Sequence, residues 1–502
     1  MSVDSRAQVR EALGQLLGIH GTALCREPSR CEAFLRDMCP QGRRETAVLV
    51  AALKYGICDA LLDLPEVFSR EELIHSLSSR LFDEAGIDRE WALWAVVTWA
   101  LALGVLDKDI PPFSGGGSQK LPESGAKRRR PAKKVSRREI AIKSLIVDAS
   151  GAGDFQRIGD ALEMSGQGAR IFVRPGTYRE NLTISKEVEV IGEGRPSEVI
   201  VSPPGGTILV VSKSAYVHGL TFVYAPSEKL DVPAVEFRRG SALMEDCSIV
   251  SASEGIRISG AGTTPTIRRC RIETGEGEGI CCDSRSKPVI EFTTITSRSP
   301  ASAAVHVCGG AAPVMKDSSV KGGHACMEFR ERSRGLMERC TISGAVYAGI
   351  SIQELADPHL LQCAIENGQT GIEISNKGKG TLENCEVKGS REGIRITEGG
   401  DPSVKRCRVH RCLFGIRVSQ KGRGTIEGCT ITRNDYSGVS IKEEGSPFIR
   451  RCTITENGDA GIWVHKKGRG RVEENDLEGN RKGGLHIEAG SKVKARGNRG
   501  TP

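Results

Sequence analysis

Aliphatic and polar residues alternate in short runs through the C-terminal part of the chain, and the runs recur at a fixed interval. Between Gly371 and Ile454 each copy reads glycine, aliphatic, any residue, aliphatic, a turn with Gly or Pro, aliphatic, two polar residues, Cys, any residue, aliphatic. A fixed period of this size is typical of a stacked repeat architecture. The glycines that open successive copies lie 22 to 23 residues apart and are Gly371, Gly393, Gly415, Gly438, Gly461 and Gly484.

Within each copy the aliphatic residues occupy every second position, as at Ile372 and Ile374, and this alternation indicates strands. No run has the length or spacing of a helix. We therefore predict two short strands and two or three bends per copy, which make one coil of a parallel β-helix with glycines at its corners. Such coils stack about 4.8 Å apart, so about eleven of them would form a rod of about 50 Å.

A cysteine fills the same slot in most copies, so stacked coils would align these side chains in one inward column. Thr293 and Ser318 take the slot in two coils, and Asn475 and Asn498 take it in the last two. Small apolar filling explains the column, and since no CxxC pair occurs, we predict no metal and no cofactor. The cysteines of this structural ladder are Cys247, Cys270, Cys340, Cys363, Cys385, Cys407, Cys429 and Cys452.

The composition agrees with a narrow interior. Aromatic residues make up 4% of the chain, and 60 of its 502 residues are glycine. Seventeen cysteines, with no apolar signal-like segment at the N-terminus, favour a reducing compartment, so we expect a cytoplasmic protein. The longest apolar runs, such as 91–97, are too short to span a membrane. Cys281, Cys282 and Cys412 fall outside the predicted column.

Residues 1–108 have a different pattern, which predicts helices. The stretches 44–62 and 90–105 place apolar residues at helical spacing, and Gly104 is a plausible stop signal. We predict a compact bundle of four or five helices over 1–108, followed by a mainly β domain over 140–498.

The tryptophans of the second stretch, Trp91, Trp94 and Trp99, are expected in the core of this bundle. The strings CPQGRRETAVLVAALKYGI and WAVVTWALALGV resemble a small helical module that bacterial multidomain proteins fuse to kinases, chaperone-like domains or β-helices. The resemblance covers about 80 residues. It implies a bacterial protein in which the module recruits a protein partner.

Residues 109–139 read as a flexible linker, rich in Pro, Gly and Ser and then in basic residues. The net charge of the chain is +8, and the segment between Lys127 and Arg138 carries eight positive residues and no acid. The rest of the chain is therefore near neutral and shows no broad nucleic-acid footprint. We expect contact with nucleic acid, if any, only through this tract.

The β-helix is expected to begin near residue 140. Residues 154–164 predict a short helix that caps the open end of the stack. The string that follows resembles the opening of pectin methylesterases and of the wider pectin-lyase-like superfamily. It contains Arg174, Pro175, Gly176, Thr177, Tyr178 and Glu180. The resemblance implies a right-handed parallel β-helix and its starting point.

The sequence shows none of the paired Asp, Gln and Arg motifs of pectin methylesterases after Glu180, nor those of polygalacturonases. Asp357-Pro358-His359 resembles the catalytic string of alginate epimerases, but Asp401-Pro402 fills the same slot two coils later, which indicates a corner. We therefore predict no catalytic residues. The irregular region 283–334 is expected to hold a bulged loop, and acids converging there would indicate an enzyme.

Basic residues recur at the bend after the opening strand of alternate coils, whereas the coils between carry acids there. We interpret this edge as a solvated corner or as an elongated surface for an acidic glycan or peptide. The candidate ligand-binding residues are Lys377, Lys379, Lys421, Arg423, Lys467 and Arg469.

Two functions remain open. The first is a non-catalytic intracellular scaffold that presents a long face to a protein or carbohydrate partner. The second is a carbohydrate-active enzyme, which would need two carboxylates facing one cleft.

Overall fold

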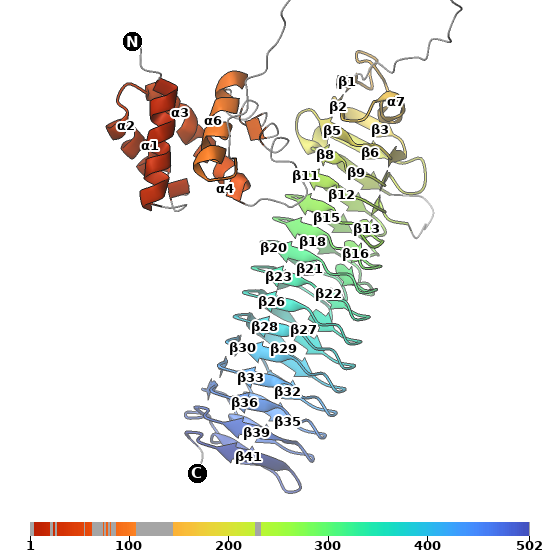
Figure 1. Ribbon diagram of the computed structural model, residues 1–502. Helices are drawn as coiled ribbons and strands as arrows, with labels where there is room; N and C mark the ends of the chain where they lie inside the picture. The colour runs from red at the N-terminus through yellow and green to blue at the C-terminus, as the bar shows by residue number, and fades with distance from the viewer. Residues whose placement is uncertain are drawn as a thin grey trace, which may run out of the picture. The chain divides into compact units, whose positions relative to one another are not determined.

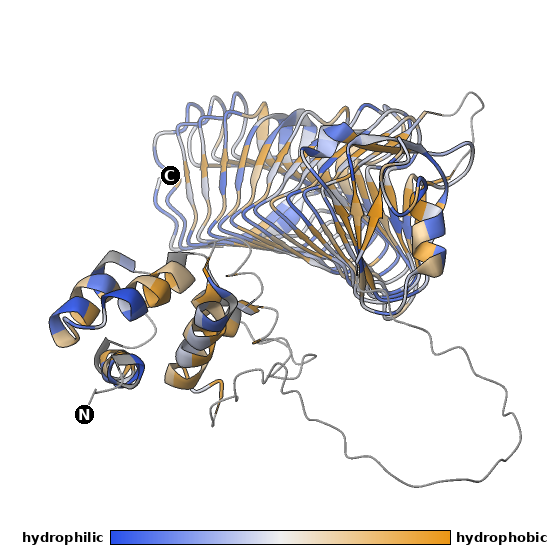
Figure 2. Cartoon of the chain, turned by 90° about the horizontal axis from the view of Figure 1, so that it is seen from above, coloured by the Kyte–Doolittle hydropathy of each residue, from blue (hydrophilic) through white to orange (hydrophobic). Residues whose placement is uncertain are grey.

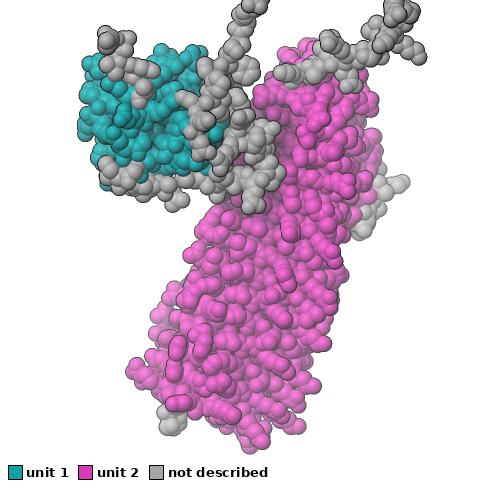
Figure 3. All heavy atoms as spheres, in the orientation of Figure 1, with its two compact units in different colours: residues 1–133 teal, residues 134–502 magenta. Residues whose placement is uncertain are grey.

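A computed structural model describes residues 5–20, 24–25, 28–54, 56–62, 74, 77–78, 81, 87–106, 144–225 and 232–500. The chain forms two compact units, Met1–Lys133 and Lys134–Pro502, which Figure 3 colours separately. The predicted linker 109–139, including its basic tract, lies outside the described residues.

The first unit is helical, as predicted, and its helices enclose one apolar core. The predicted helix 44–62 is interrupted at Gly56, which adopts a left-handed φ of 67°. Among the described residues no helix is both long and apolar enough to span a membrane. The helices are α1 (Ser5–His20), α2 (Pro28–Met38), α3 (Arg43–Lys54), α4 (Ile57–Leu62) and α6 (Arg89–Ala102).

The tryptophans of α6 do not all lie in the core. Trp94 and Trp99 are buried, and the Trp99 indole N–H donates to the Leu49 carbonyl at 3.1 Å. Trp91 is only half-buried, with the guanidinium groups of Arg6 and Arg44 lying 4.0 and 4.4 Å from its ring centroid. The bundle therefore buries two of these rings and uses the third as a platform for cations.

The second unit is a parallel solenoid from residue 144 to the C-terminus, and each regular turn contributes a strand to three faces (Figure 1). Face A is a 16-stranded sheet. Its strands are β1 (Ser144–Val147), β2 (Ala169–Val173), β5 (Val188–Gly192), β8 (Tyr216–His218), β11 (Leu243–Glu245), β14 (Thr266–Arg268), β17 (Val289–Glu291), β20 (Val314–Lys316), β23 (Leu336–Glu338), β26 (His359–Leu361), β28 (Thr381–Glu383), β30 (Ser403–Lys405), β33 (Thr425–Glu427), β36 (Phe448–Arg450), β39 (Arg469–Glu473) and β41 (Lys492–Arg496).

Faces B and C are two ladders of a 25-stranded sheet that share the long strands β27 and β29. Face B comprises β3 (Gly176–Arg179), β6 (Val199–Ser202), β9 (Thr221–Tyr224), β12 (Ser248–Ser251), β15 (Arg271–Thr274), β18 (Thr294–Ser297), β21 (Ser319–Gly322), β24 (Thr341–Ser343), β27 (Ala364–Ile374), β29 (Glu386–Ile396), β31 (Arg408–His410), β34 (Thr430–Thr432) and β37 (Thr453–Thr455). Face C comprises β4 (Leu182–Ile184), β7 (Leu209–Val211), β10 (Val235–Phe237), β13 (Ile256–Ile258), β16 (Ile280–Cys282), β19 (Val305–Val307), β22 (Ala325–Phe329), β25 (Ala348–Ile352), the second halves of β27 and β29, β32 (Phe414–Val418), β35 (Val439–Ile441), β38 (Ile462–Val464) and β40 (Leu485–Ile487).

The solenoid has about 15 turns, so the expectation of about eleven coils was wrong. The count was low because the first turns, those of β1, β2, β5 and β8, precede Cys247 and carry no cysteine in the repeated slot. The expectation of two strands per coil was also wrong. The third strand, on face A, is only three residues long in most turns and was too short to separate from the turn before it.

Parallel pairing without register shifts stacks each position on its copy in the next turn. On face A, Leu382 pairs with Val404 and Val404 with Ile426, and all three are fully buried. The interior is therefore a set of aliphatic columns that run along the solenoid (Figure 2). Each buried aliphatic side chain stabilises the fold by about 1.5–3 kcal/mol relative to its exposed state.

The structural ladder lies directly after face A, two residues past each strand end and inside the solenoid. The thiols are buried; Cys385 Sγ, for example, lies 3.5 Å from the Leu360 carbonyl of the preceding turn. Where the slot is polar, the stack becomes a hydrogen-bonded ladder, because the Asn475 backbone N–H donates to the Asn498 side chain at 3.0 Å. Thr293 and Ser318 extend the same column, and the Thr293 N–H donates to Ser318 Oγ at 3.1 Å.

The repeat glycines do not turn corners, contrary to expectation. Gly371, Gly393 and Gly415 form a column at the start of face C, and a Cβ on Gly393 would lie 2.5 Å from the Gly415 carbonyl oxygen. Close approach of backbones, and not a left-handed φ, therefore requires glycine there. The corners are turned by other residues with positive φ, such as Arg406 (50°) before Cys407 and Lys421 (62°) after face C.

The first turn is closed by the helix α7 (Ile158–Met164), which packs on β1, β2 and β4. The buried Glu180 carboxylate accepts hydrogen bonds from the backbone N–H groups of Ile158 and Gly159 at 2.8 and 2.9 Å. The Tyr178 hydroxyl donates to the Arg174 carbonyl at 2.8 Å. The residues that carry the resemblance to pectin methylesterases thus fasten the cap.

The glycine column predicts a contrast between two Gly→Ala variants. Gly393→Ala is expected to destabilise the β-helix by about 1–3 kcal/mol, since the added methyl group overlaps a backbone oxygen. Gly205→Ala is the matched control, because its Cβ would meet nothing within 4 Å, and it should change stability by less than about 0.5 kcal/mol. Thermal unfolding followed by circular dichroism measures both, and equal melting temperatures would contradict the role of the column.

Candidate functional surfaces

The middle residue of each face C strand points outward, so one side chain per turn forms a straight row along this face. From Cys281 to His486 the in-register pairs place one such residue about every 4.8 Å, and the column continues toward the N-terminus through Arg257 and Glu236. We call these positions the face C row: Cys281, His306, Glu328, Ser351, Glu373, Arg395, Arg417, Ser440, Trp463 and His486. Sequence analysis missed the row because its residues differ from turn to turn; the only signal is the fixed position between the two aliphatic residues of each opening strand.

The centre of the row is a buried network of opposite charges. The Tyr347 hydroxyl donates to Glu373 Oε1 at 2.9 Å, and Arg395 Nε lies 3.7 Å from the same carboxylate. Arg395 also approaches Glu392 at 3.9 Å, and Arg417 donates to Glu392. Burial raises the pKa of Glu373, and it raises the pKa of Tyr347 to about 12, with the nearby Glu373 adding to that rise. The carboxylates and guanidinium groups balance, so the centre of the row presents little net charge.

Aromatic rings flank this network toward the C-terminus. Phe414 and Tyr436 stack with centroids 4.9 Å apart, and the Arg417 guanidinium lies 4.0 Å from the Phe414 ring centroid. Trp463 stacks on His465 at 3.8 Å, and its indole N–H donates to Glu488 at 3.1 Å. Tyr436 is 48% exposed, and its ring offers an apolar surface with a polar tip.

The irregular region 283–334 contributes a histidine between two carboxylates. His306 Nδ1 lies 3.9 Å from Glu278, and its Nε2 lies 3.8 Å from Glu328. A loop of seven residues, 298–304, follows β18 here and accounts for the longer spacing of this turn. The region therefore brings a titratable side chain into the face C row.

The basic candidate residues all lie at exposed bends immediately after face C, on the edge between faces C and A. We call this edge, residues 354–469 at its bends, the charged edge. Successive bends carry opposite charge, so basic groups recur every second turn, about 10 Å apart. The candidates that the structure brings together on this edge are Lys377, Lys379, Lys421, Arg423, Lys467 and Arg469.

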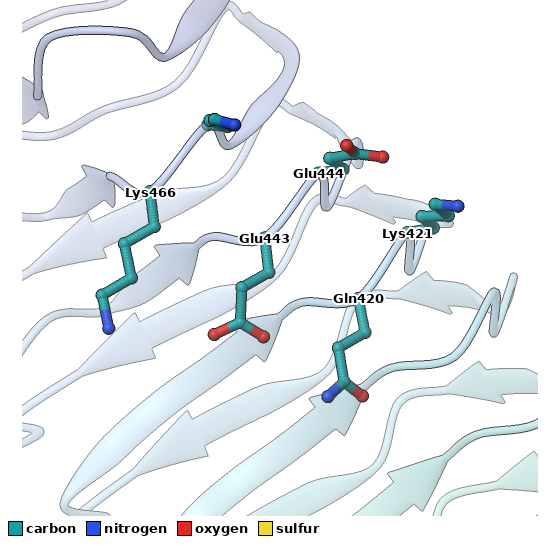
Figure 4. A pocket seen from close by; sticks show the side chains of 6 residues that line it. Gln420, Lys421, Glu443, Glu444 and Lys466 are labelled. Carbon is teal, nitrogen blue, oxygen red and sulfur yellow. The ribbon is translucent and has the colours of Figure 1, made fainter.

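A shallow hollow of about 440 Å³ lies over three successive bends of the charged edge (Figure 4). Figure 4 shows Gln420, Glu443 and Lys466 pointing in one direction as parallel side chains, while Lys421 and Glu444 point in another. The hollow is lined by Gln420, Lys421, Glu443, Glu444, Lys466 and Lys467. Its acidic members lie between the basic ones, so it is not a uniformly basic site.

The alternation of charge also occurs on face A, where it has a structural explanation. Glu245, Arg268 and Glu291 follow one another in the column, and Arg268 lies 3.8 Å from Glu245 and 3.0 Å from Glu291. Lys316 and Glu338 continue the pattern at 3.5 Å. Face A thus pairs its charges within the molecule, across successive turns.

The string Asp357-Pro358-His359 lies at a corner, as predicted. Asp357 accepts a hydrogen bond from the Gly380 backbone N–H of the next turn at 3.1 Å. His359 lies on face A, 3.5 Å from Glu383. The two side chains therefore serve different surfaces.

His218, Glu245 and Asp246 form a group whose ligand atoms lie within 4.8 Å of one another. Arg269 lies 3.1 Å from Glu245 and 2.7 Å from Asp246. Since this guanidinium already bridges both carboxylates, ion pairing explains the cluster, and we assign no metal to it.

Comparison with known families rests on the repeated turns described above. A family model described as "Right handed beta helix region" matches residues 229–352, 254–388 and 358–499, which together cover more than half of the chain. The chain belongs to the right-handed β-helix family. The predicted right-handed parallel β-helix is thereby confirmed. No curated protein matches the chain.

The chain is also similar to solved structures of three other proteins. A pectin methylesterase from Erwinia chrysanthemi is 14% identical, with 45% of this chain and 79% of that chain covered and a TM-score of 0.32. The A-module of a mannuronan C-5 epimerase from Azotobacter vinelandii is 13% identical, with 68% and 93% covered and a TM-score of 0.37. A periplasmic alginate epimerase is 10% identical, with 66% and 76% covered and a TM-score of 0.41. Such identities concern the fold and not the activity of this β-helix.

The buried carboxylate of Glu373 predicts a pH dependence of opposite sign to that of an ordinary ion pair. Because the folded-state pKa of Glu373 is raised by burial, its contribution to stability is present below the unfolded value of about 4.3 and is lost as the pH rises through the folded value. Glu373→Gln should therefore gain melting temperature relative to wild type as the pH rises from about 4 to about 8.

Asp317→Asn is the matched control for this experiment. Arg339 holds the pKa of Asp317 below its ordinary value through hydrogen bonds of 2.7 and 2.8 Å, so this carboxylate contributes stability above the unfolded pKa. The variant should lose melting temperature at neutral pH, and the loss should shrink below about pH 4. Parallel pH profiles for the two variants would contradict the assignment of the Glu373 shift to burial.

Proposed function

We propose that this chain is a non-catalytic binding scaffold that holds an extended polysaccharide along face C. The observation that carries the proposal is the face C row, with one outward side chain about every 4.8 Å on a rigid ladder. A linear polymer of sugar rings repeats on a similar scale and offers hydroxyl groups for polar contacts and ring faces for aromatic ones. Sites on strands hold such groups more accurately than sites on loops.

The chemistry of the row favours a polymer with many hydroxyl groups and few charges. The carboxylates of Glu373 and Glu392 already have guanidinium partners, so a charged ligand would have to displace them. The exposed ring of Tyr436 and the half-buried ring of Trp463 provide flat apolar surfaces that end in polar atoms. These features support binding of an uncharged or weakly charged sugar chain.

The proposal also includes a role for the helical unit and a location of the protein in the cell. A compact helical unit supports its role as an adaptor for a protein partner. All seventeen cysteines are free thiols, which supports a reducing, cytoplasmic location. The basic segment between Lys127 and Arg138 stays a prediction for nucleic-acid contact.

A carbohydrate-active enzyme is the second candidate, and one observation favours it. His306 lies between Glu278 and Glu328 on face C, and a histidine held by carboxylates can act as a general acid or base. Such an enzyme would alter the polymer that the scaffold would only bind.

Trp463→Ala is expected to weaken polysaccharide binding at least about tenfold, which corresponds to about 1.4 kcal/mol, because a stacking surface is lost. Affinity electrophoresis of the full chain in gels containing a neutral glucan, a mannan, pectin or alginate measures retardation. The matched control is Phe448→Ala on face A, where the ring contacts Arg471 at 4.4 Å and binding should be unchanged.

The same polysaccharides should emerge from overnight incubation with unchanged chain length and substitution. A new reducing end, an unsaturated product or released methanol would indicate an enzyme and contradict the scaffold proposal, provided that His306→Ala abolishes the product. Retardation equal in both aromatic variants would remove face C as the binding surface.

A further inference from the structure

The bends of the charged edge alternate in the sign of their net charge over six consecutive turns. Each bend carries two or three charged groups of its own sign, and all of these groups except Glu354 and Glu443 are exposed. From the N-terminal end the bends are acidic (Glu354, Asp357), basic (Lys377, Lys379), acidic (Glu398, Asp401), basic (Lys421, Arg423), acidic (Glu443, Glu444) and basic (Lys466, Lys467, Arg469).

The backbone of the edge holds these side chains in fixed directions. Lys421 N–H donates to the Glu443 carbonyl at 3.1 Å, and Glu443 N–H donates to the Lys466 carbonyl at 2.9 Å. Two successive left-handed residues form each bend, as at Gln420 (46°) and Lys421 (62°). Gly309 and Gly310 form an equivalent bend without side chains, so the strained lysines and glutamates are not required by the turn itself.

The charges of the edge are largely unused within the molecule. Among the described residues no ion pair joins one bend of this edge to the next, in contrast to face A. Glu443 pairs with Lys442 of its own bend, and Glu354 pairs with Arg330, which lies in the bend of the preceding turn. Most charged groups of these bends therefore remain available to pair with another molecule.

We propose that the charged edge is a self-complementary interface through which two copies of this chain associate antiparallel about a two-fold axis. An even number of alternating bends has a special property under such an axis, because every bend then meets one of opposite sign. The bend at 398–401 would face the bend at 420–423 of the second copy, 376–379 would face 443–446, and 354–357 would face 466–469. Six turns span about 25 Å, and the contact is isologous, as in most two-fold dimers.

The strength of the dimer depends on several exposed charge pairs acting together. Each exposed pair contributes little to the free energy of association. Salt weakens the attraction further, because the Debye length is about 10 Å at 0.1 M ionic strength. The association should therefore be weak at physiological salt and should strengthen as the ionic strength falls. Two copies in parallel register would place like charges opposite one another, which disfavours that arrangement.

Charge reversal at the two central bends tests the pairing in the full chain. The first variant, Lys421→Glu with Arg423→Glu, makes both central bends acidic, and the second, Glu398→Lys with Asp401→Lys, makes both basic. Sedimentation velocity at low ionic strength should show at least about tenfold weaker dimerisation for each variant alone. An equimolar mixture of the two should dimerise like wild type, because opposite bends again face each other.

The chain that carries all four substitutions separates the antiparallel arrangement from a staggered parallel one. This chain exchanges the signs of the two central bends, so every antiparallel pair is again of opposite charge and dimerisation should recover. The exchange places two basic and two acidic bends side by side along the edge, which a staggered parallel arrangement would not tolerate. Melting temperatures check that all variants fold. A monomeric wild type at low salt, or failure of the mixed pair to associate, overturns the proposal. Binding of an acidic polysaccharide that needs Lys421 and Arg423 but tolerates loss of Glu398 and Asp401 also overturns it, in favour of a glycan surface.

Discussion

Hydrogen bonding from each turn to the next, in constant register, is the constraint on which the rest of this molecule depends. It makes residues 22 or 23 positions apart immediate neighbours, so the side chain at each position must pack against the side chain at the same position of the next turn. Aliphatic slots accept this at no cost and form the core. Polar slots accept it when the side chain both donates and accepts, as in the ladder from Asn434 through Asn457 to Asn480, where each backbone N–H meets the next amide oxygen. Charged slots on face A change sign from turn to turn, because like charges 4 Å apart repel by about 1 kcal/mol even in water, whereas Arg395 and Arg417 on face C stack with acidic partners beside them.

The period and the alternation of aliphatic residues were sufficient to predict a parallel β-helix. Its start was implied by the resemblance around Tyr178, and its cap was predicted from residues 154–164. The period and the alternation were insufficient for the number of faces and turns. Face A strands of three residues, such as β28, are too short to show periodicity, and the first four turns lack the cysteine that was counted. The corner residues were also missed, because Arg406 and Lys421 adopt a conformation that sequence reasoning reserves for glycine and asparagine.

The cysteines outside the ladder became intelligible only from the register. Cys412 occupies the slot of the Asn434 ladder, where its backbone N–H donates to Asn434 at 3.0 Å. Cys282 points into the core of face C, and Cys281 points out into the row. The row itself had no residue type in common, and its members are related only by where the ladder places them. Function is therefore harder to predict from this repeat than fold, since the repeat preserves the slots that pack and leaves the outward slot free.

The two-turn alternation at the bends has a consequence for how such a rod can change in length. In the same stretch the residue before each face A strand alternates as well, with Pro358, Pro402 and Pro447 separated by Gly380 and Gly424. A Cβ on Gly424 would lie 2.7 Å from the Pro402 carbonyl, so packing and charge share one unit of two turns. Gain or loss of a single turn would put bends of one sign in contact and break that unit, whereas gain or loss of two would leave both patterns intact. Turns in this stretch are thus expected to be gained or lost in pairs.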